Sequence, residues 1–199
     1  MPYDDDFYDQ YREYLEEPVV RKQHGSMFNL FGSICCSHNY GNVIDLGSGL
    51  NEYLQYSCVV DNYLAIDYNN PNNIKNFIEG DYTIGVLKYL KDWPFQPNIF
   101  VSLFSIEACL PPDAKYHLYR RIFEEVPSIR YGLVSGFYYE SKRDNLLVNE
   151  NGKITSFQTI ENQMDWQDDT FTEMRTILRV PSKMFGDDVY EVWKILKRN

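Results

Sequence analysis

Residues 43–49 read Val-Ile-Asp-Leu-Gly-Ser-Gly, a short apolar run that ends in two closely spaced glycines. The run predicts a buried strand over 42–46, and the glycines predict a tight turn into a short helix over 50–55. Glycine lets backbone approach a ligand closely and leaves its amide groups accessible. The stretch therefore predicts a ligand-binding turn, although a single Gly-X-Gly pattern is common in proteins.

Acidic residues follow the turn at informative places. Asp45 precedes it, Asp67 ends the next predicted strand over 63–66, and Asp81 follows a brief strand at 77–78. Because the carboxyl ends of parallel strands meet at one edge of a sheet, we expect these groups to converge in one crevice. A carboxylate at the end of the second strand can accept both hydroxyls of a ribose, as an adenosine-containing cofactor requires.

The second half of the chain extends the same alternation. A continuous apolar strand is predicted over 98–104, a helix from Pro111 to about Val126, and a strand over 131–138. Strands that alternate with helices predict a parallel sheet covered on both faces. Two final strand-like runs, 172–180 and 189–197, have no helix between them and should form an antiparallel hairpin.

Three further helices are expected over 3–17, 26–35 and 84–90, whereas the polar segment 141–170 fits no clear pattern. The fold class is thus α/β, a Rossmann-like three-layer sandwich around a mostly parallel seven-stranded sheet with a C-terminal antiparallel hairpin. We expect one domain over residues 1–199. Its expected parts are a helical cap over 1–35, a cofactor-binding core over 42–139 and a C-terminal part over 140–199 that holds the hairpin.

Charge is concentrated at the N-terminus. The chain of 199 residues has a formal net charge of -10, and residues 1–17 hold seven acidic side chains against one basic. From Pro18 on, 22 acidic and 18 basic residues remain, without the basic stripe that phosphate backbones need. The composition therefore argues against a nucleic-acid partner.

The sequence predicts a soluble, cytoplasmic protein without membrane contact. No stretch approaches the ~20 apolar residues of a membrane span, and the acidic N-terminus lacks the basic region of a signal peptide. The four cysteines form no Cys-X-X-Cys pair, and the ligand-like spacing of Cys35 and His38 has no second pair to answer it. We therefore expect free thiols and no metal site. Oligomeric state is not predicted.

The choice of cofactor depends on residue 52. The dinucleotide fingerprint Gly-X-Gly-X-X-Gly would require a glycine there, but the chain has Glu52. A carboxylate would repel a pyrophosphate, whereas it tolerates the ammonium and sulfonium groups of S-adenosylmethionine (SAM). Asp45 also suits a ligand with an amino group.

Together, residues 42–139 resemble the class I SAM-dependent methyltransferases. DLGSG at 45–49 is similar to the first motif of that family, LAID at 64–67 to its acidic second-strand motif, and GDY at 80–82 to the segment whose Asp contacts the adenine amine. FVSLFSIE at 100–107 is similar to the fourth-strand motif beside the methionine part. Two departures are Asn51, where a third glycine is frequent, and the lack of an evident helix in 141–165.

The resemblance implies SAM as cofactor and a set of residues that contact it. These are Asp45, Gly47, Ser48, Gly49, Asp67, Tyr68, Asp81, Tyr82 and Ser105. Alternatives stay open for the acids. Asp45 could cap the turn, Asp67 could form a turn, Asp81 could cap the helix at 84–90, and Glu107 could be solvated at a strand end.

Other candidates concern acid–base chemistry and the N-terminal helix. A dedicated base is needed only for an acceptor that is protonated at neutral pH, and the candidates are Glu107, His24 and Tyr138. His117 is expected at the surface. The aromatic face of the first helix, with Tyr11 and Tyr14, is expected to contact the core, although the resemblance allows it to cover the cofactor.

The predicted function is SAM-dependent methyl transfer to a small molecule or a protein. The fourth strand ends in Ser105-Ile106-Glu107 and lacks the Asn/Asp-Pro-Pro-aromatic tetrapeptide typical of base methylation in nucleic acids. Two alternatives remain open, a non-catalytic SAM-binding or interaction module and an NAD-dependent oxidoreductase.

Overall fold

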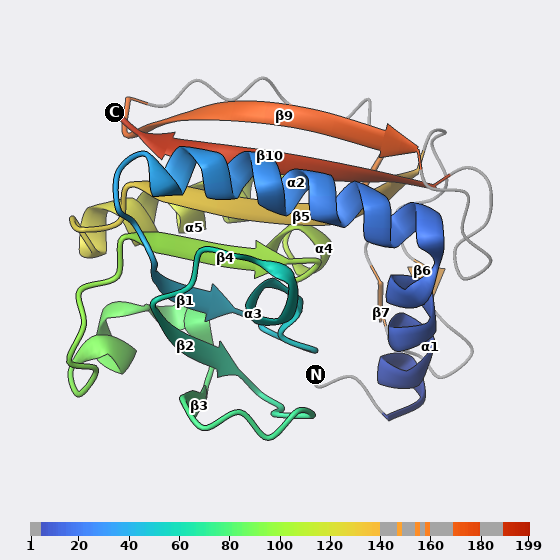
Figure 1. Cartoon of the computed structure of the whole chain (residues 1–199), viewed down its shortest axis with the longest axis horizontal. Helices are drawn as coiled ribbons and strands as arrows, with labels where there is room; N and C mark the ends of the chain where they lie inside the picture. Colours follow the sequence, from blue (N-terminus) through green and yellow to red (C-terminus); the bar gives the residue numbers. More distant parts are fainter. Residues whose placement is uncertain (1–4, 140–146, 149–153, 156–157, 160–168, 180–188) are drawn as a thin grey trace.

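The fold is built on one mixed sheet in the strand order β3-β2-β1-β4-β5-β10-β9 (Figure 1). The computed structural model describes residues 5–139, 147–148, 154–155, 158–159, 169–179 and 189–199. The strands of the sheet are β1 (Asn42–Leu46), β2 (Asn62–Asp67), β3 (Phe77–Glu79), β4 (Ile99–Leu103), β5 (Tyr131–Tyr139), β9 (Phe171–Arg179) and β10 (Val189–Arg198).

Five strands are parallel, and β10 inserts antiparallel between β5 and β9. This confirms the predicted α/β sandwich and its closing hairpin. A short strand β8 (Gln158–Thr159) pairs with the end of β5, while β6 (Leu147–Val148) and β7 (Ile154–Thr155) form a separate pair. The rest of the segment 141–165, where we could assign no helix, lies outside the described residues.

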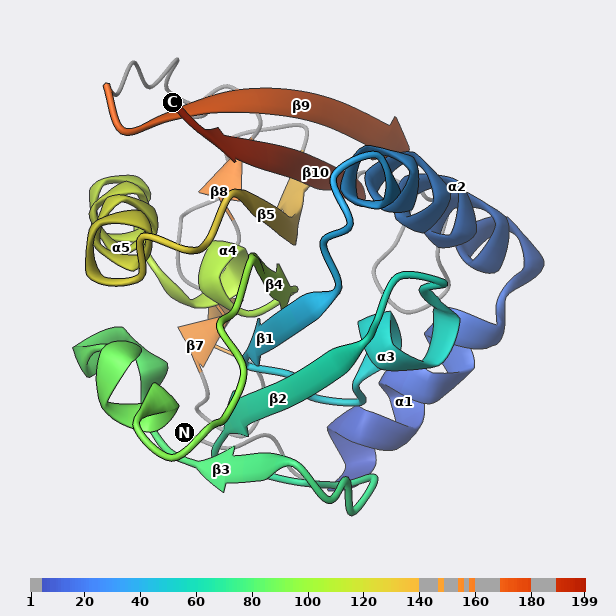
Figure 2. The same cartoon turned by 60° about the vertical axis from the view of Figure 1, so that its left-hand side comes forward.

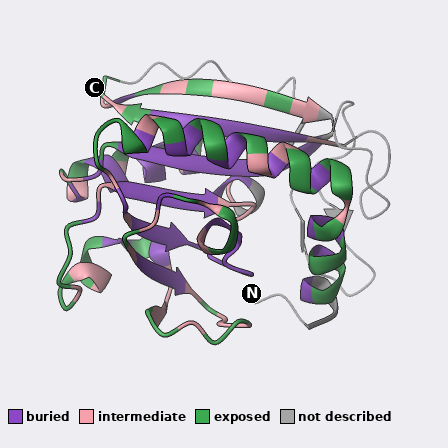
Figure 3. Cartoon of the chain, in the orientation of Figure 1, coloured by how far each residue is buried: buried purple, intermediate pink, exposed green. Residues whose placement is uncertain are grey.

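Helices cover both faces of the sheet, and a further helix stands across its edge (Figures 1 and 2). Helices α2 (Pro18–Cys36) and α3 (Glu52–Tyr56) bury Phe28, Phe31 and Tyr53 against one face, and α5 (Pro112–Glu125) buries Tyr119 and Phe123 against the other. A short α4 (Ile106–Cys109) follows β4. Strands β1, β2, β4, β5 and β10 are largely buried between these layers, whereas the outer strands β3 and β9 are partly exposed (Figure 3).

Helix α1 (Asp5–Glu16) lies beyond the carboxyl ends of the parallel strands (Figure 1). Pro18 stops it, and the same proline occupies the first turn of α2, where its fixed φ and missing N–H are tolerated. Helix α2 therefore begins eight residues before the predicted span over 26–35. No helix among the described residues combines the length and apolarity that crossing a membrane requires.

The predicted helix over 84–90 is wrong. The chain forms two 3-10 turns there, η1 (Tyr82–Ile84) and η2 (Leu87–Leu90), separated by Gly85 and Val86. Gly85 has φ 135, a conformation that no α-helix contains and that side-chain-bearing residues rarely adopt. The apolar spacing resembled a helix, but the glycine divides the segment into pieces too short for one.

Candidate cofactor site

The glycine turn after β1 contains three residues in the left-handed region. Gly47 has φ 70, Gly49 has φ 47 and Asn51 has φ 57. Asparagine tolerates this conformation better than most residues because its short polar side chain bonds locally. Asn51 thus keeps the backbone shape at the position where the resemblance expects a third glycine, and this departure leaves the turn intact.

Gly47 brings together two other predicted site residues. A Cβ at this position would collide with the Ser105 hydroxyl and lie 3.2 Å from the Tyr82 ring. The Tyr82 and Ser105 hydroxyls are hydrogen-bonded to each other at 2.5 Å. Three segments far apart in sequence therefore meet at the point where the strand order reverses between β1 and β4, the usual ligand crevice of such sheets.

The turn also holds buried oxygens that have no hydrogen-bond partner. Within the described part of the chain these include Asp45 Oδ1, Ser48 Oγ and Asn51 Oδ1. Buried polar atoms are nearly always paired, so each such atom requires an explanation. All three can accept a hydrogen bond, so this set fits a ligand that brings donors, such as an ammonium group.

Asp45 lies at the centre of this set. Its Oδ2 accepts a hydrogen bond of 2.5 Å from the Tyr63 hydroxyl, and its Oδ1 has no partner. Burial raises the pKa of Asp45 to about 7, and the charges of Asp67 and Glu52 add to this effect, while Tyr63 opposes it. A nearby positive charge would restore the ionised form, so the site favours a cationic ligand.

Asp67 reaches from the end of β2 to the glycine turn. Its Oδ2 accepts the Gly49 N–H at 2.8 Å, and its Oδ1 accepts the Tyr68 N–H at 2.6 Å. Burial raises the pKa of Asp67, and these backbone bonds oppose that shift. The turn-forming alternative is therefore present, but a carboxylate offers about four acceptor sites, so acceptor capacity remains for a ribose.

Asp81 and Tyr68 lie at the outer part of the site. Asp81 Oδ1 accepts the Thr83 N–H at 2.8 Å and its hydroxyl at 2.5 Å, the capping arrangement that we kept as an alternative, here for η1. Burial opposes ionisation of Asp81, but the Thr83 bonds outweigh it and lower the pKa. Tyr68 is exposed. An adenine contact for Asp81 stays a prediction.

The alternative that placed Glu107 in solvent at a strand end is wrong. Glu107 is buried on the α5 side of the sheet, and four donors surround it. Lys115 Nζ and Lys194 Nζ each bond it at 2.8 Å, Tyr119 bonds it at 2.5 Å, and Tyr138 donates to it as well. Burial would raise the pKa of Glu107, but the two lysines outweigh this and lower it to about 2. With four donors, neither Glu107 nor Tyr138 is free to take a proton.

His24 lies between two buried carboxylates. Its Nδ1 bonds Glu52 of α3, and its Nε2 lies 2.8 Å from Glu191 of β10. Burial would lower the pKa of His24, but Glu52 and Glu191 outweigh it and raise the pKa to about 10. His24 is therefore an imidazolium at neutral pH and cannot serve as a base. Sequence reasoning did not identify Glu191, because it lies in the apolar run of β10 without a motif around it.

Helix α1 adds two tyrosine hydroxyls to the buried network formed by His24, Glu52 and Glu191. The Tyr14 hydroxyl donates to Glu191, and the Tyr11 hydroxyl donates to Glu52 at 3.3 Å. Trp193 Nε1 also donates to Glu191, at 2.8 Å. Tyr11 and Tyr14 are buried, which confirms the expected core contact, and His117 is exposed as expected.

Phe104 is a further candidate site residue, which sequence reasoning did not identify. It follows β4 and has φ 53, a rare backbone state for a bulky side chain, and such strain concentrates at functional sites. Its ring stacks on Phe137 at 4.3 Å and on His24 at 5.7 Å, and it meets the edge of Tyr11 at 5.9 Å. In the sequence, Phe104 is one of several apolar residues in FVSLFSIE at 100–107, and no local pattern distinguishes it from the others.

Comparison with known proteins gives structural neighbours only. No protein-family model matches the chain, and no curated protein matches its sequence. A Burkholderia thailandensis 1,6-didemethyltoxoflavin-N1-methyltransferase superposes with a TM-score of 0.54 at 16% identity, covering 98% of this chain and 86% of that one. The methyltransferase domain of bacterial CtHen1 gives 0.54 at 13% identity, covering 88% and 98% of the two chains.

A third neighbour is the magnesium protoporphyrin IX methyltransferase of Synechocystis PCC 6803, with a TM-score of 0.51 at 9% identity over 98% of this chain and 92% of that one. At such low sequence identities, these superpositions show a shared fold and not a shared activity. They agree with the observed strand order and with the antiparallel insertion of β10. The chain therefore has the fold of the class I SAM-dependent methyltransferases.

Proposed function

We propose that this chain is a SAM-dependent methyltransferase that acts on a small molecule or a protein. The observation that carries the proposal is the glycine turn with its three unpaired buried oxygens, Asp45 Oδ1, Ser48 Oγ and Asn51 Oδ1. They form an acceptor-rich cradle that suits the ammonium of SAM. Structural neighbours that act on small molecules, by their own names, support this class of acceptor.

The cofactor would be held by residues of the turn and the adjoining strand ends. Asp45, Ser48 and Asn51 would hold its ammonium, Asp67 its ribose and Asp81 its adenine amine. When bound, SAM supplies an electrophilic methyl group on a sulfonium. The remaining task of the protein is to orient the acceptor and to exclude water.

The aromatic side chains between α1 and the sheet edge would exclude water. Tyr8 lies 3.9 Å from the point where a Cβ of Gly49 would be, and Phe104 and Phe137 stack beside it in the same apolar cluster. Because His24, Glu107 and Tyr138 are all engaged, the arrangement favours an acceptor that already carries a free lone pair at neutral pH.

Calorimetric titration tests the cofactor assignment. We expect S-adenosylhomocysteine to bind and NAD not to bind, because Glu52 stands where a pyrophosphate site requires glycine and because α3 spans only five residues. Tight binding of NAD with no response to S-adenosylhomocysteine would replace the proposal with the oxidoreductase alternative.

A second measurement separates an enzyme from a non-catalytic SAM-binding module. Purified protein is incubated with methyl-labelled SAM and panels of small molecules and peptides, and label transfer is followed. Binding of S-adenosylhomocysteine without transfer to any acceptor would favour the module. We also propose a cytoplasmic location, which is consistent with the free thiols of Cys35, Cys36 and Cys58.

A further inference from the structure

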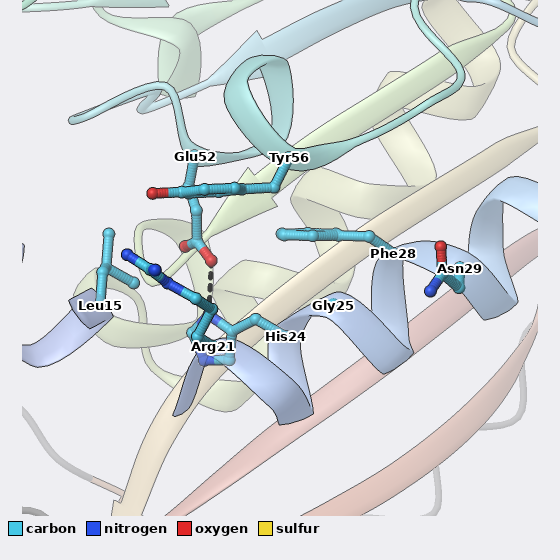
Figure 4. Close-up of a pocket in the computed structure, with 8 residues that line it drawn as sticks. All are labelled: Leu15, Arg21, His24, Gly25, Phe28, Asn29, Glu52 and Tyr56. Carbon is cyan, nitrogen blue, oxygen red and sulfur yellow. Dashed lines mark hydrogen bonds and ion pairs between the residues drawn. The ribbon is translucent and has the colours of Figure 1, made fainter. Parts of the chain in front are cut away.

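A cavity lies between α1, α2 and α3, beside Glu52 (Figure 4). Its volume is about 200 Å³, room for roughly seven water molecules at ~30 Å³ each. Its lining consists of Leu15, Arg21, His24, Gly25, Phe28, Asn29, Glu52 and Tyr56. None of these residues belongs to the predicted cofactor set, so the cavity is distinct from the glycine turn.

Gly25 leaves one wall of the cavity open. It lies inside the 19-residue helix α2, where glycine destabilises by about 1 kcal/mol relative to alanine. A Cβ at this position would meet no atom within 4 Å. Close packing therefore does not require the glycine, and its effect in the folded protein is to keep space free.

The inner end of the cavity carries unbalanced negative charge. Glu52 points from α3 toward His24 on α2, and Glu191 holds the other side of the same imidazole (Figure 4). Two carboxylates against one imidazolium leave one net negative charge among buried groups, because Tyr11, Tyr14 and Trp193 contribute only neutral donors. Uncompensated charge in a buried place is costly, so a further cation there would be stabilised.

The other groups that face the cavity define the rest of a ligand. Phe28 from α2 and Tyr56 from α3 provide apolar ring surfaces (Figure 4). Arg21 also lines the cavity, but it is exposed, so water screens its charge. The lining thus combines apolar rings with a buried carboxylate.

We propose that this cavity binds a small organic cation, with an ammonium group against Glu52 and a flat apolar body between Phe28 and Tyr56. The volume limits the body to about one aromatic ring with a short chain. The site shares no residue with the set assigned to SAM, although the charge of Glu52 also acts on Asp45.

The test is a calorimetric titration at pH 7 with phenethylamine, and with 3-phenylpropionate as a ligand of equal chain length and opposite charge. We expect the amine to bind and the acid to give no heat. In Gly25→Leu the added side chain fills the cavity, and we expect amine affinity to fall at least tenfold. Leucine is a better helix former than glycine, so this variant should fold.

Ser33→Leu is the matched control, because it places a leucine on an exposed position of the same helix. It should leave amine binding unchanged. Absence of amine binding, equal binding in Gly25→Leu, or equal binding of the acid would each overturn the proposal. S-adenosylhomocysteine titrated into Gly25→Leu reports the cofactor site separately, so failure of one site is distinguishable from failure of the other.

Discussion

Asp67 joins the end of β2 to the glycine turn, and its removal should affect ligand binding more than folding. Asp67→Ala deletes two hydrogen bonds to ribose, each worth on the order of 1.5–3 kcal/mol because the acceptor is charged. Water recovers part of this loss. We therefore expect S-adenosylhomocysteine affinity to fall by roughly 2–4 kcal/mol, about 30- to 1000-fold, in a calorimetric titration.

The same substitution also removes the bonds to the Gly49 and Tyr68 amides, and because water at this strand end replaces much of both, thermal melting should show a loss of roughly 1–2 kcal/mol. Asp92→Ala, at an exposed position, should change neither quantity. A folded Asp67→Ala protein with an unchanged dissociation constant would leave Asp67 as a turn residue only.

Glu107 and Glu124 offer a comparison of a buried with an exposed carboxylate. Glu107→Gln leaves Lys115 and Lys194 buried with only the more distant carboxylate of Glu173, 4.0 Å from Lys194 Nζ, so we expect unfolding free energy to fall by about 3–5 kcal/mol. Glu124→Gln removes a half-exposed pair with Arg120 and should cost less than ~1 kcal/mol. Urea unfolding of both variants measures the difference, and equal losses would contradict the assigned role of the Glu107 network.

Among the elements, the strands were predictable because each is a short apolar run bounded by polar or turn-forming residues. The runs at 42–46, 98–104 and 131–138 correspond closely to β1, β4 and β5. The conformation of segment 84–90 was not predictable, because apolar spacing alone does not indicate that Gly85 adopts a positive φ. Helix α2 was underestimated because its first eight residues show a weaker apolar pattern.

The candidate site likewise has one part that the sequence predicts and another part that it does not. Local signals revealed the turn at 45–49 and Asp67, since both depend on neighbours in sequence. The contacts of His24 with Glu52 and Glu191 join residues 28 and 167 positions apart, and no local pattern reports such pairings. Sequence reasoning could therefore select candidates for a base only by residue type. In the structure, His24, Glu107 and Tyr138 are each hydrogen-bonded to buried partners.

Helix α1 depends on buried hydroxyl groups for its attachment to the sheet edge. Tyr14→Phe removes the donor to Glu191 and leaves that carboxylate with fewer partners. A bond to a charged group contributes about 1.5–3 kcal/mol, so amide hydrogen exchange within α1 should accelerate about 10- to 100-fold. Exchange in the central strands should change less.

Arg12→Gln is the control on the same helix, because Arg12 pairs with Asp9 at an exposed position. It should leave exchange in α1 nearly unchanged. Equal acceleration in the two variants would show that general helix stability, rather than the Tyr14 bond, holds α1 in place.

For the whole molecule, His24 predicts a loss of stability in alkali. Its pKa in the folded protein is about 10 against an ordinary value near 6.5. Protonation therefore favours the folded state: the contribution is complete below about pH 6.5 and disappears as pH rises toward 10. We expect a fall on the order of 3–5 kcal/mol in unfolding free energy across this interval, measured by urea titration at several pH values.

Lys115 acts in the opposite direction, because burial lowers its pKa to about 8 and stability then rises with pH above that value. His24→Gln retains Lys115, so the difference between the two proteins isolates the histidine. The difference should shrink steadily from pH 6.5 to 10. Parallel curves would mean that His24 is neutral in the folded protein.

Strand β10 carries a member of each buried charge network, Glu191 toward α2 and Lys194 toward α5, and it pairs between β5 and β9. Ribosomes make a chain from its N-terminus, so every member of these networks that lies outside β10 is synthesised before it. While translation continues, His24 lacks one of its two carboxylates, Glu107 lacks one of its two lysines, and β5 lacks its antiparallel neighbour. The nascent chain therefore cannot complete either half of its interior, and final compaction has to wait until residues 189–198 have emerged.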